Sequence, residues 1–241
     1  MDNIYQEMKK RIYPLLLEKN LLNESVKIKA RALSTEEAIG NPESEDFPLQ
    51  KGKERLMQAE FLNGRGQAFT DLYGDFEGSL SEIMDTVPVN NFRRAVFVAT
   101  LNAVLDHLKL IDRTVHCRDH GPAQCGEALK DYINNHYGWK KILQIGFQPA
   151  MVKSLSSHFP LRVIDLDPLN IGSRKFQKDI EGPEVYDEAI EWADILLVTG
   201  STIVNGTIET FLTDKPVIFY GTTIAGPAHL MGWERFCNED K

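Results

Sequence analysis

The sequence has no run of about 18 consecutive apolar residues, the length that a membrane-spanning helix needs. Its first ten residues, Met1 to Lys10, are mostly polar or charged and lack the apolar core of a secretory signal. These two absences predict a chain that neither spans a membrane nor is secreted, and they favour the cytoplasm.

Cysteine is also scarce: there are three, and an odd, low count argues against a disulfide framework. Basic residues are outnumbered, because 27 Lys and Arg face 35 Asp and Glu and give a net charge of −8. General nucleic-acid binding depends on neutralising phosphates with Lys and Arg. We therefore expect a globular protein whose partner is a small molecule, not nucleic acid or a membrane, with a homodimer as the default assembly.

Residues 1–112 predict a small α+β domain. A helix is expected over Asp2–Leu22, and Asn63-Gly64 is a strong hairpin signal between alternating stretches at 55–62 and 67–70. Asn90 caps a predicted helix over 90–110 that is apolar on more than one side, as expected of a helix buried between layers. Asn102 lies inside this helix, so its amide must find hydrogen-bond partners.

After a linker and helix at 113–138, with the helix beginning at Glu127, the pattern changes. In residues 139–241, strands predicted at 141–145, 161–164, 195–198 and 217–220 alternate with helical segments. Alternation of this kind predicts βαβ units and a parallel, Rossmann-like sheet.

Three of these strands end in a glycine turn, and the carboxyl ends of parallel strands meet at one edge of the sheet, where open α/β sheets bind ligands. Glycine lets a backbone approach a ligand closely, and free N–H groups favour an anion. The alternative is that these residues serve only turns and helix caps. None of the turns carries the full G-x-G-x-x-G fingerprint, so tight NAD or ATP binding is not supported. The predicted ligand-binding residues of the turns are Gly146, Thr199, Gly200, Ser201, Thr202, Gly221 and Thr222.

Four carboxylate or amide side chains extend this prediction. Asp165 and Asp167 end the second strand, about 20 residues after Gly146, where an acidic residue typically holds ribose hydroxyls; the alternative is a solvated strand end. Asn205 and Glu209 are four apart in a helix predicted over Thr202–Thr213 and so share a face. We expect them to orient a ligand, with Glu209 as an acid or base if burial raises its pKa. Gly206 between them suggests a close backbone approach.

The linker contains a second candidate site. His116, Cys117, His120 and Cys125 are four soft or borderline metal ligands within ten residues. Their spacing matches no standard zinc motif, and adjacent residues of an extended chain point to opposite sides. A polar connector with a turn at Gly121-Pro122 is the competing interpretation.

Several segments together resemble the family described as a putative heavy-metal chelation domain with its own N-terminal partner domain. They are 47–54, 66–71, 99–103, 114–117 and, most specifically, 199–209, Thr-Gly-Ser-Thr-Ile-Val-Asn-Gly-Thr-Ile-Glu. The resemblance implies an enolase-N-terminal-like α+β domain followed by a Rossmann-like domain, with the active site in the cleft between them. It does not imply enolase activity, since the chain is too short for the barrel that supplies the magnesium-binding carboxylates. The chain ends at Lys241, soon after Gly226-Pro227, from which we expect a more open site than in relatives.

Three functions compete at this point. The first is binding, with or without transformation, of a small anionic or metal-chelating metabolite, the cofactor being a divalent metal or a nucleotide-like ligand. The second is metal binding or delivery by the segment His116–Cys125. The third is a non-catalytic partner protein, which predicts that side chains fill the glycine turns.

Overall fold

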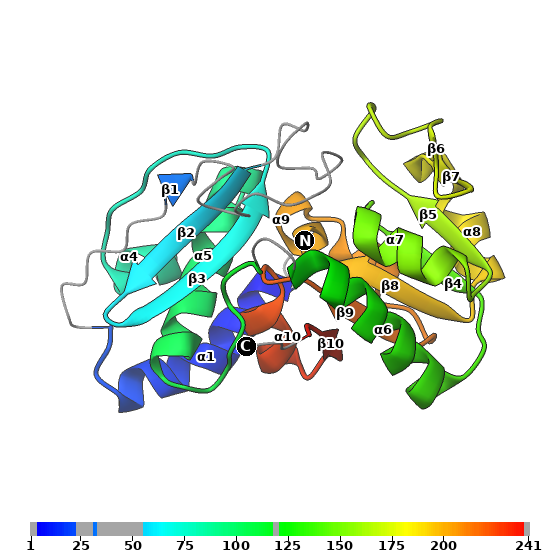
Figure 1. Ribbon diagram of the computed structural model, residues 1–241. Helices are drawn as coiled ribbons and strands as arrows, with labels where there is room; N and C mark the ends of the chain where they lie inside the picture. Colours follow the sequence, from blue (N-terminus) through cyan, green and yellow to red (C-terminus); the bar gives the residue numbers. More distant parts are fainter. Residues whose placement is uncertain (1–3, 23–30, 33–54, 118–120, 239–241) are drawn as a thin grey trace.

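The computed structural model describes residues 4–22, 31–32, 55–117 and 121–238 (Figure 1). In its first half a three-stranded antiparallel sheet, in the order β1-β2-β3, packs against α5. Residues 26–32 alternate between apolar and polar side chains, which predicts a strand, but most of this segment lies outside the described residues. The elements of this half are α1 (Ile4–Glu18), β1 (Arg31–Ala32), β2 (Arg55–Phe61), β3 (Gly64–Thr70), α4 (Leu80–Asp85) and α5 (Asn91–His107).

Local sequence explains how this half folds. The predicted hairpin is confirmed, because β2 and β3 pair from Arg55↔Thr70 to Phe61↔Gly64. Its two-residue turn is Leu62-Asn63, one residue earlier than the predicted Asn63-Gly64. The side chain of Asn90 accepts a hydrogen bond from the N–H of Arg93 and caps α5 as expected. Sequence reasoning missed α4, although Ser79 and Glu82 form a capping box at its start.

The second half contains a seven-stranded sheet in the order β10-β9-β8-β4-β5-β7-β6, parallel except for β6. The chain starts at β4, moves outward through β5 to β7, and returns to the other side of β4 to build β8, β9 and β10. The order in which strands are added therefore reverses between β4 and β8. Open α/β sheets bind ligands at such a switch point. The elements are α6 (Gly121–Tyr137), β4 (Ile142–Ile145), α7 (Pro149–Ser156), β5 (Leu161–Ile164), β6 (Arg174–Lys175), β7 (Lys178–Glu181), η1 (Pro183–Val185), α8 (Tyr186–Trp192), β8 (Ile195–Thr199), α9 (Ser201–Asn205), η2 (Ile208–Phe211), β9 (Val217–Tyr220), α10 (Ala225–Met231) and β10 (Arg235–Phe236).

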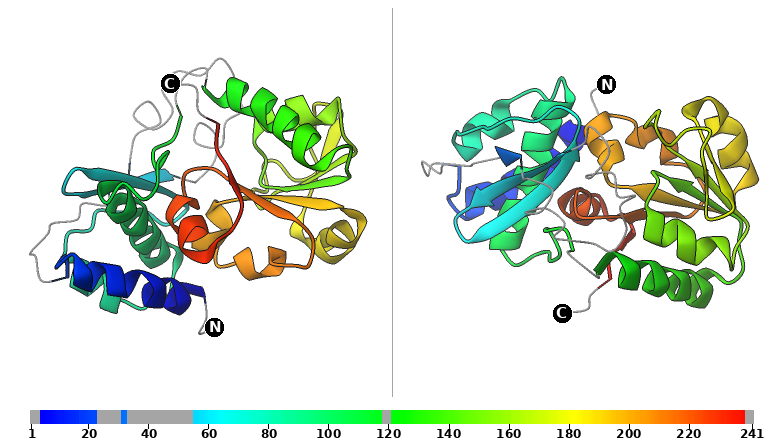
Figure 2. Two further views of the ribbon diagram at one scale, coloured as in Figure 1. Left: turned by 90° about the horizontal axis from the view of Figure 1, so that it is seen from below. Right: turned by 45° about the horizontal axis from the view of Figure 1, so that its top comes forward.

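Alternate residues of each strand face two different apolar cores, as the period of a strand requires. On one face, Ile142, Val163 and Leu197 pack with α6 and α7. On the other face, Leu143 and Val198 join a core that also contains buried residues of α1 and α5. Figure 2 shows α5, α9 and α10 between the two sheets. The two halves therefore share one continuous core, which fixes the first sheet relative to the carboxyl edge of the second.

Two predictions about helices were wrong. The helix expected from Glu127 begins at Gly121, because Gly121-Pro122 opens α6 and does not form a turn; proline suits the first positions of a helix, whose N–H groups lack partners anyway. The helix expected over Thr202–Thr213 is two short helices, α9 and the 3₁₀ segment η2, separated at Gly206. Short β6, β7 and β10 were not predicted.

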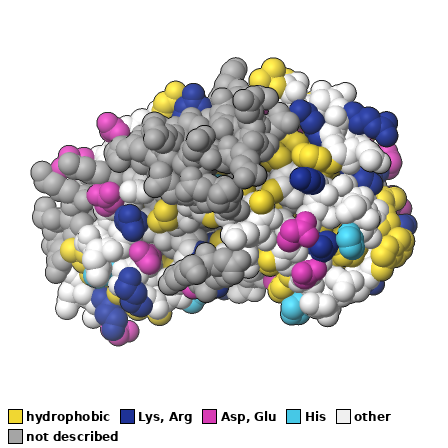
Figure 3. Space-filling view, viewed as in Figure 1, with side chains coloured by type: hydrophobic (Ala, Val, Ile, Leu, Met, Phe, Trp, Pro, Cys, Tyr) yellow, Lys and Arg dark blue, Asp and Glu magenta, His cyan; other side chains and the backbone are white. Residues whose placement is uncertain are grey.

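The surface gives two broad findings. Among the described residues, no helix combines the length and apolar character that a membrane span requires. Acidic and basic side chains are interspersed on the face shown in Figure 3, and neither sign forms a broad patch there.

Candidate functional site

The two turns at the switch point are closely packed. A Cβ at Gly146 would lie 2.8 Å from Cγ2 of Thr199, and one at Gly200 would lie 2.8 Å from the backbone nitrogen of Ile224. The N–H of Gly146 donates to the carbonyl of Ile164, and its carbonyl accepts from the hydroxyl of Tyr220 at 2.8 Å. These glycines therefore bring protein segments together, and little of their backbone is left for a ligand.

The hydroxyls that follow β8 are mostly occupied. Thr202, which is buried, donates from Oγ1 to the carbonyl of Thr199 at 2.8 Å. The hydroxyls of Thr199 and Ser201 lie 3.2 Å apart and form a pair. The Thr199–Ser201 pair remains half-buried, so it is the part of this turn that can still meet a ligand.

The turn after β9 differs from the other two. Gly221 has φ +94°, a conformation that residues with a side chain rarely adopt, and a Cβ placed there would meet no atom of the described residues within 4 Å. Thr222 is 3% exposed, and its hydroxyl oxygen has no hydrogen-bond partner among the described residues. A buried hydroxyl without a partner is costly, so its environment needs a donor or acceptor that the described chain does not provide. This turn, with open space at Gly221 and an unpartnered hydroxyl on the next residue, is therefore the candidate ligand site.

A cation lies against this open turn. Arg235 of β10 donates from Nε to the carbonyl of Gly221 at 3.1 Å and from Nη2 to the carbonyl of Arg113 at 2.7 Å. Its third described hydrogen bond also goes to a carbonyl, that of Asp112. Burial lowers the pKa of Arg235, but a guanidinium stays protonated in proteins. The described hydrogen bonds of this guanidinium go to uncharged carbonyls, while the nearby carboxylate of Asp112 offsets part of its positive charge.

The carboxylates after β5 serve their own loop. Asp165 accepts from the N–H of Phe147 and of Asp167, both at 2.8 Å, and from the side-chain amide of Asn170 at 3.2 Å. Asp167 accepts from the N–H of Leu169 at 3.0 Å. These bonds are accounted for by the alternative to ligand binding, in which the two carboxylates only end the strand.

The pair Asn205 and Glu209 does not share a helix face. Gly206, with φ +73°, ends α9 in a left-handed conformation, so the four-residue spacing no longer places the two side chains on one continuous helix. The close approach expected at Gly206 does exist, since a Cβ there would lie 2.9 Å from Nη1 of Arg94. Glu209 is exposed, so the burial on which its predicted acid-base role depends is absent. Its charge instead adds to the pKa of Tyr5, which burial raises to about 12.

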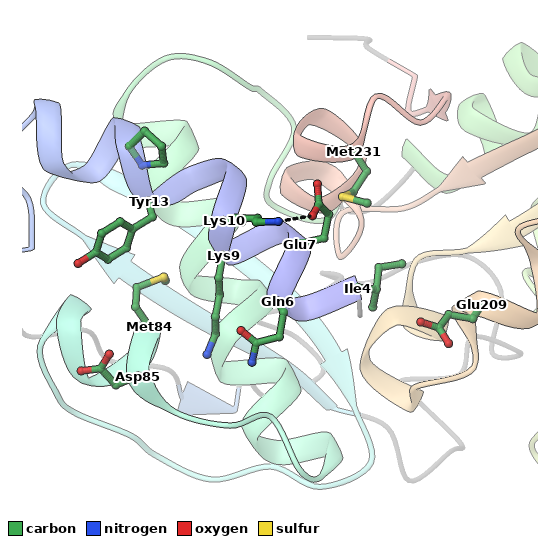
Figure 4. A pocket seen from close by; sticks show the side chains of 11 residues that line it. Ile4, Gln6, Glu7, Lys9, Lys10, Tyr13, Met84, Asp85, Glu209 and Met231 are labelled. Atoms are coloured by element: carbon green, nitrogen blue, oxygen red, sulfur yellow. Dashed lines mark ion pairs between the residues drawn. The ribbon is translucent and has the colours of Figure 1, made fainter. Parts of the chain in front are cut away.

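Glu209 also lines a surface depression of about 820 Å³. Figure 4 shows that most of its side chains come from α1 and that Lys10 pairs with Glu7. Positive and negative groups alternate around this hollow, and the turns after β4, β8 and β9 contribute nothing to its lining. It is therefore a different place from the site predicted at the sheet edge.

The linker segment lies between the two halves. The N–H of His116 donates to Oε1 of Gln67, and its Nδ1 lies 2.5 Å from the carbonyl of Cys117, so this nitrogen carries the hydrogen. Burial lowers the pKa of His116. Among the described residues, no three His, Cys, Asp or Glu side chains are placed to hold one metal ion. His120 lies outside the described residues, so the four-residue metal site stays a prediction.

All three cysteines, however, come near one another. Burial raises the pKa of Cys125 to about 11, and the thiol of Cys237 adds to that shift. The pKa of Cys117 rises to about 12, chiefly through desolvation and further through the other two thiols. Sequence spacing could not bring Cys237 into this group, because the unpredicted strand β10 places it there.

Sequence reasoning also missed Arg235, Tyr220 and the partners of Asn102. Arg235 follows no recognisable motif, and only the pairing of β10 with β9 brings it to Gly221. Tyr220 was read as the end of a strand, although its hydroxyl reaches Gly146. The one signal in the sequence was Asn102, a polar residue in an apolar helix.

Comparison with known proteins confirms the family resemblance and the fold. Residues 131–225 match the sequence model of the family DUF364, described as putative heavy-metal chelation. Two similar solved structures carry titles that describe proteins of unknown function from that family. The one from Pyrococcus horikoshii is 19% identical, with a TM-score of 0.57, and covers 92% of this chain and 80% of its own. The one from Desulfitobacterium hafniense is 12% identical, with the same TM-score, and covers 96% and 83%. No curated protein matches the chain. At these identities the structures show a shared two-part α/β fold and no activity.

Proposed function

We propose that the protein binds a small anionic metabolite at the carboxyl edge of its parallel sheet, centred on the turn Gly221-Thr222. The observation that carries the proposal is the open space at Gly221 beside the unpartnered hydroxyl of Thr222. The family description, putative heavy-metal chelation, is consistent with a metal or a small chelating ligand.

An anion suits this turn for electrostatic reasons. Arg235 lies on the carbonyl of Gly221, and its described hydrogen bonds go only to uncharged carbonyls. An anion beside it gains more than it would in water, because burial weakens solvent screening. The hydroxyls of Thr222 and Ser201 can supply neutral hydrogen bonds on either side.

The remaining predicted residues take lesser roles in this proposal. The backbones of Gly146, Gly200 and Thr202 shape the edge, and Asp165 with Asp167 builds the neighbouring loop. Asn205 and Glu209 stay predictions as ligand-orienting residues, and we assign no acid-base step to the exposed Glu209. Cytoplasmic location and a homodimer also stay predictions.

A thermal-shift screen tests the proposal. Purified protein is heated with sulfate, inorganic phosphate, citrate, AMP or S-adenosylmethionine, each matched for ionic strength with sodium chloride. A ligand that binds the folded state raises the melting temperature, and the stabilisation grows with the ratio of its free concentration to its Kd. We expect at least one of these anions to stabilise the native chain and to stabilise Thr222→Val less. If no anion stabilises the protein and Asn205→Ala leaves stability unchanged, the proposal is wrong.

A soft-metal site is the second candidate, and the meeting of Cys117, Cys125 and Cys237 favours it. Each of these thiols makes its neighbour harder to deprotonate. A thiophilic cation binds the deprotonated form and would offset the repulsion between the thiolates. Because the described side chains are not arranged around one ion, the metal would have to draw the thiols together or recruit His120. Elemental analysis decides between the candidates: stoichiometric metal that is lost in Cys125→Ser supports this one, and metal-free protein that still binds an anion rejects it.

A further inference from the structure

We propose that Asn102 is a positioning residue for the anion-binding turn, through which the first half of the chain holds residues 221–226 in the conformation that binds. This inference rests on the proposed function and adds that the site is built by both halves of the molecule. It assigns a role to a residue that lies on α5, outside the parallel sheet.

The contacts of Asn102 are unusually complete. Its side chain is fully buried, and Nδ2 lies 2.9 Å from the carbonyl of Gln67, 3.2 Å from that of Thr222 and 3.1 Å from that of Thr223. Its Oδ1 accepts from the N–H of Gly226 at 2.6 Å. Both ends of the amide are therefore used, and three of the four contacts go to the turn.

Only an amide of this shape fits these partners. The two hydrogens of the amide nitrogen are shared among three carbonyl acceptors, and the oxygen accepts from one N–H, a combination that neither an apolar side chain nor a carboxylate can match. The helix around it is buried on every side, which prevents Asn102 from turning toward water. The carbonyl of Thr222 also accepts from the N–H of Ala225, but an apolar replacement would leave the N–H of Gly226 without the acceptor that Asn102 provides.

A second contact ties the same turn to the same strand. The N–H of Phe69 on β3 donates to Oγ1 of Thr223 at 3.1 Å, while Asn102 links Gln67 on β3 to the turn. The backbone of Thr222 and Thr223 is thus held by the first half of the chain on two independent points. Holding a binding segment in place before the ligand arrives lowers the ordering cost of binding.

The test replaces Asn102 with aspartate and varies the pH. At pH 8 the carboxylate of Asn102→Asp faces three carbonyl oxygens, whereas its protonated form is close in shape to asparagine and can donate again. Sulfate is the probe, because it stays a dianion from pH 5 to pH 8. Asn135→Asp, at an exposed position of α6, is the matched control. Thr223→Val, which removes only the acceptor for Phe69, is a milder variant that keeps the test available if Asn102→Asp does not fold.

We expect the sulfate affinity of Asn102→Asp to fall by about tenfold at pH 8, the scale of a lost buried hydrogen bond, and to recover toward pH 5. The native protein and Asn135→Asp should show no such recovery. Hydrogen exchange over residues 221–226 should be faster than native at pH 8 in Asn102→Asp, and slightly faster in Thr223→Val.

Two results would overturn the proposal: native exchange rates over 221–226 in folded Asn102→Asp, or an affinity loss that is equal at pH 5 and pH 8. If sulfate and the other anions fail to bind even the native protein, the proposed function fails on its own. The exchange measurement then still decides whether Asn102 positions the turn.

Discussion

Two segments leave the same edge of the parallel sheet and differ in whether their polar groups have hydrogen-bond partners. In the loop after β5, the carboxylate of Asp165 accepts three hydrogen bonds from neighbouring residues. In the turn after β9, Gly221 faces open space and the hydroxyl of Thr222 has no described partner. The acidic loop looks more like a binding site in the sequence, yet the plain turn is the one whose polar groups still need a partner.

The comparison teaches that residue type at a strand end is weaker evidence than hydrogen-bond satisfaction. A carboxylate whose oxygens are already used holds its own loop together, and a ligand would have to compete with those bonds. A buried hydroxyl with no partner gains the full value of a new bond when a ligand arrives. The two segments therefore predict opposite responses to mutation: one should lose stability and the other affinity.

The largest effect is expected in the acidic loop. Asp165→Ala leaves the N–H of Phe147 and of Asp167 without their acceptor, and we expect a loss of about 2 kcal/mol in the free energy of unfolding. Urea unfolding measures this change. Asp167→Ala, which loses one described bond to Leu169, should cost less. Sulfate affinity should stay native in both. A lower sulfate affinity in the folded Asp165→Ala variant would show that this carboxylate belongs to the binding site.

The next effect concerns the open turn itself. Gly221→Ala forces a side chain into a left-handed conformation, at a cost of about 1 kcal/mol, and puts a methyl group into the space assigned to the ligand. Gly138→Ala is the matched control, since Gly138 has φ +71° and also no atom within 4 Å of a Cβ. Thermal melts should show similar destabilisation in the two variants. Only Gly221→Ala should lose sulfate binding, and equal affinities would refute the site.

The sequence predicted β4, β5, β8 and β9 because each is an apolar run closely followed by a glycine or an acid, and local pattern is enough for that. It could not rank the three glycine turns. Gly146 and Gly200 are closed by Thr199 and Ile224, contacts that arise only when separate strands and helices meet. Arg235 belongs to a two-residue strand that has no period to detect. Gly206 was read as a helix interior because Asn205 and Glu209 flank it at helical spacing, while its left-handed conformation depends on the packed backbone.

A pair of buried threonines gives a finer comparison. Thr202 and Thr222 are both 3% exposed, but only the hydroxyl of Thr202 has a described hydrogen bond, to the carbonyl of Thr199. Valine has nearly the same shape and no hydroxyl. We expect Thr202→Val to destabilise the fold by about 1 kcal/mol and Thr222→Val to leave it unchanged or slightly more stable. Isothermal titration should then show weaker sulfate binding in Thr222→Val alone; a stability loss there would mean that its hydroxyl already has a partner.

The smallest effect needs no mutation and uses the thiol of Cys125 as a reporter of charge near the turn. Arg235, which contacts Gly221, lowers the pKa of Cys125, but burial dominates and leaves it at about 11. Iodoacetamide reacts with the thiolate, so labelling should rise about tenfold per pH unit from pH 7 to pH 9, without a plateau. An anion bound beside Arg235 offsets its field, which raises the thiol pKa and slows labelling by a factor of about two or less. Mass spectrometry of the Cys125 peptide measures the labelling rate in sulfate and in chloride at equal ionic strength. Screening by the two salts is then the same. A slower labelling rate in sulfate therefore indicates an anion held at the turn.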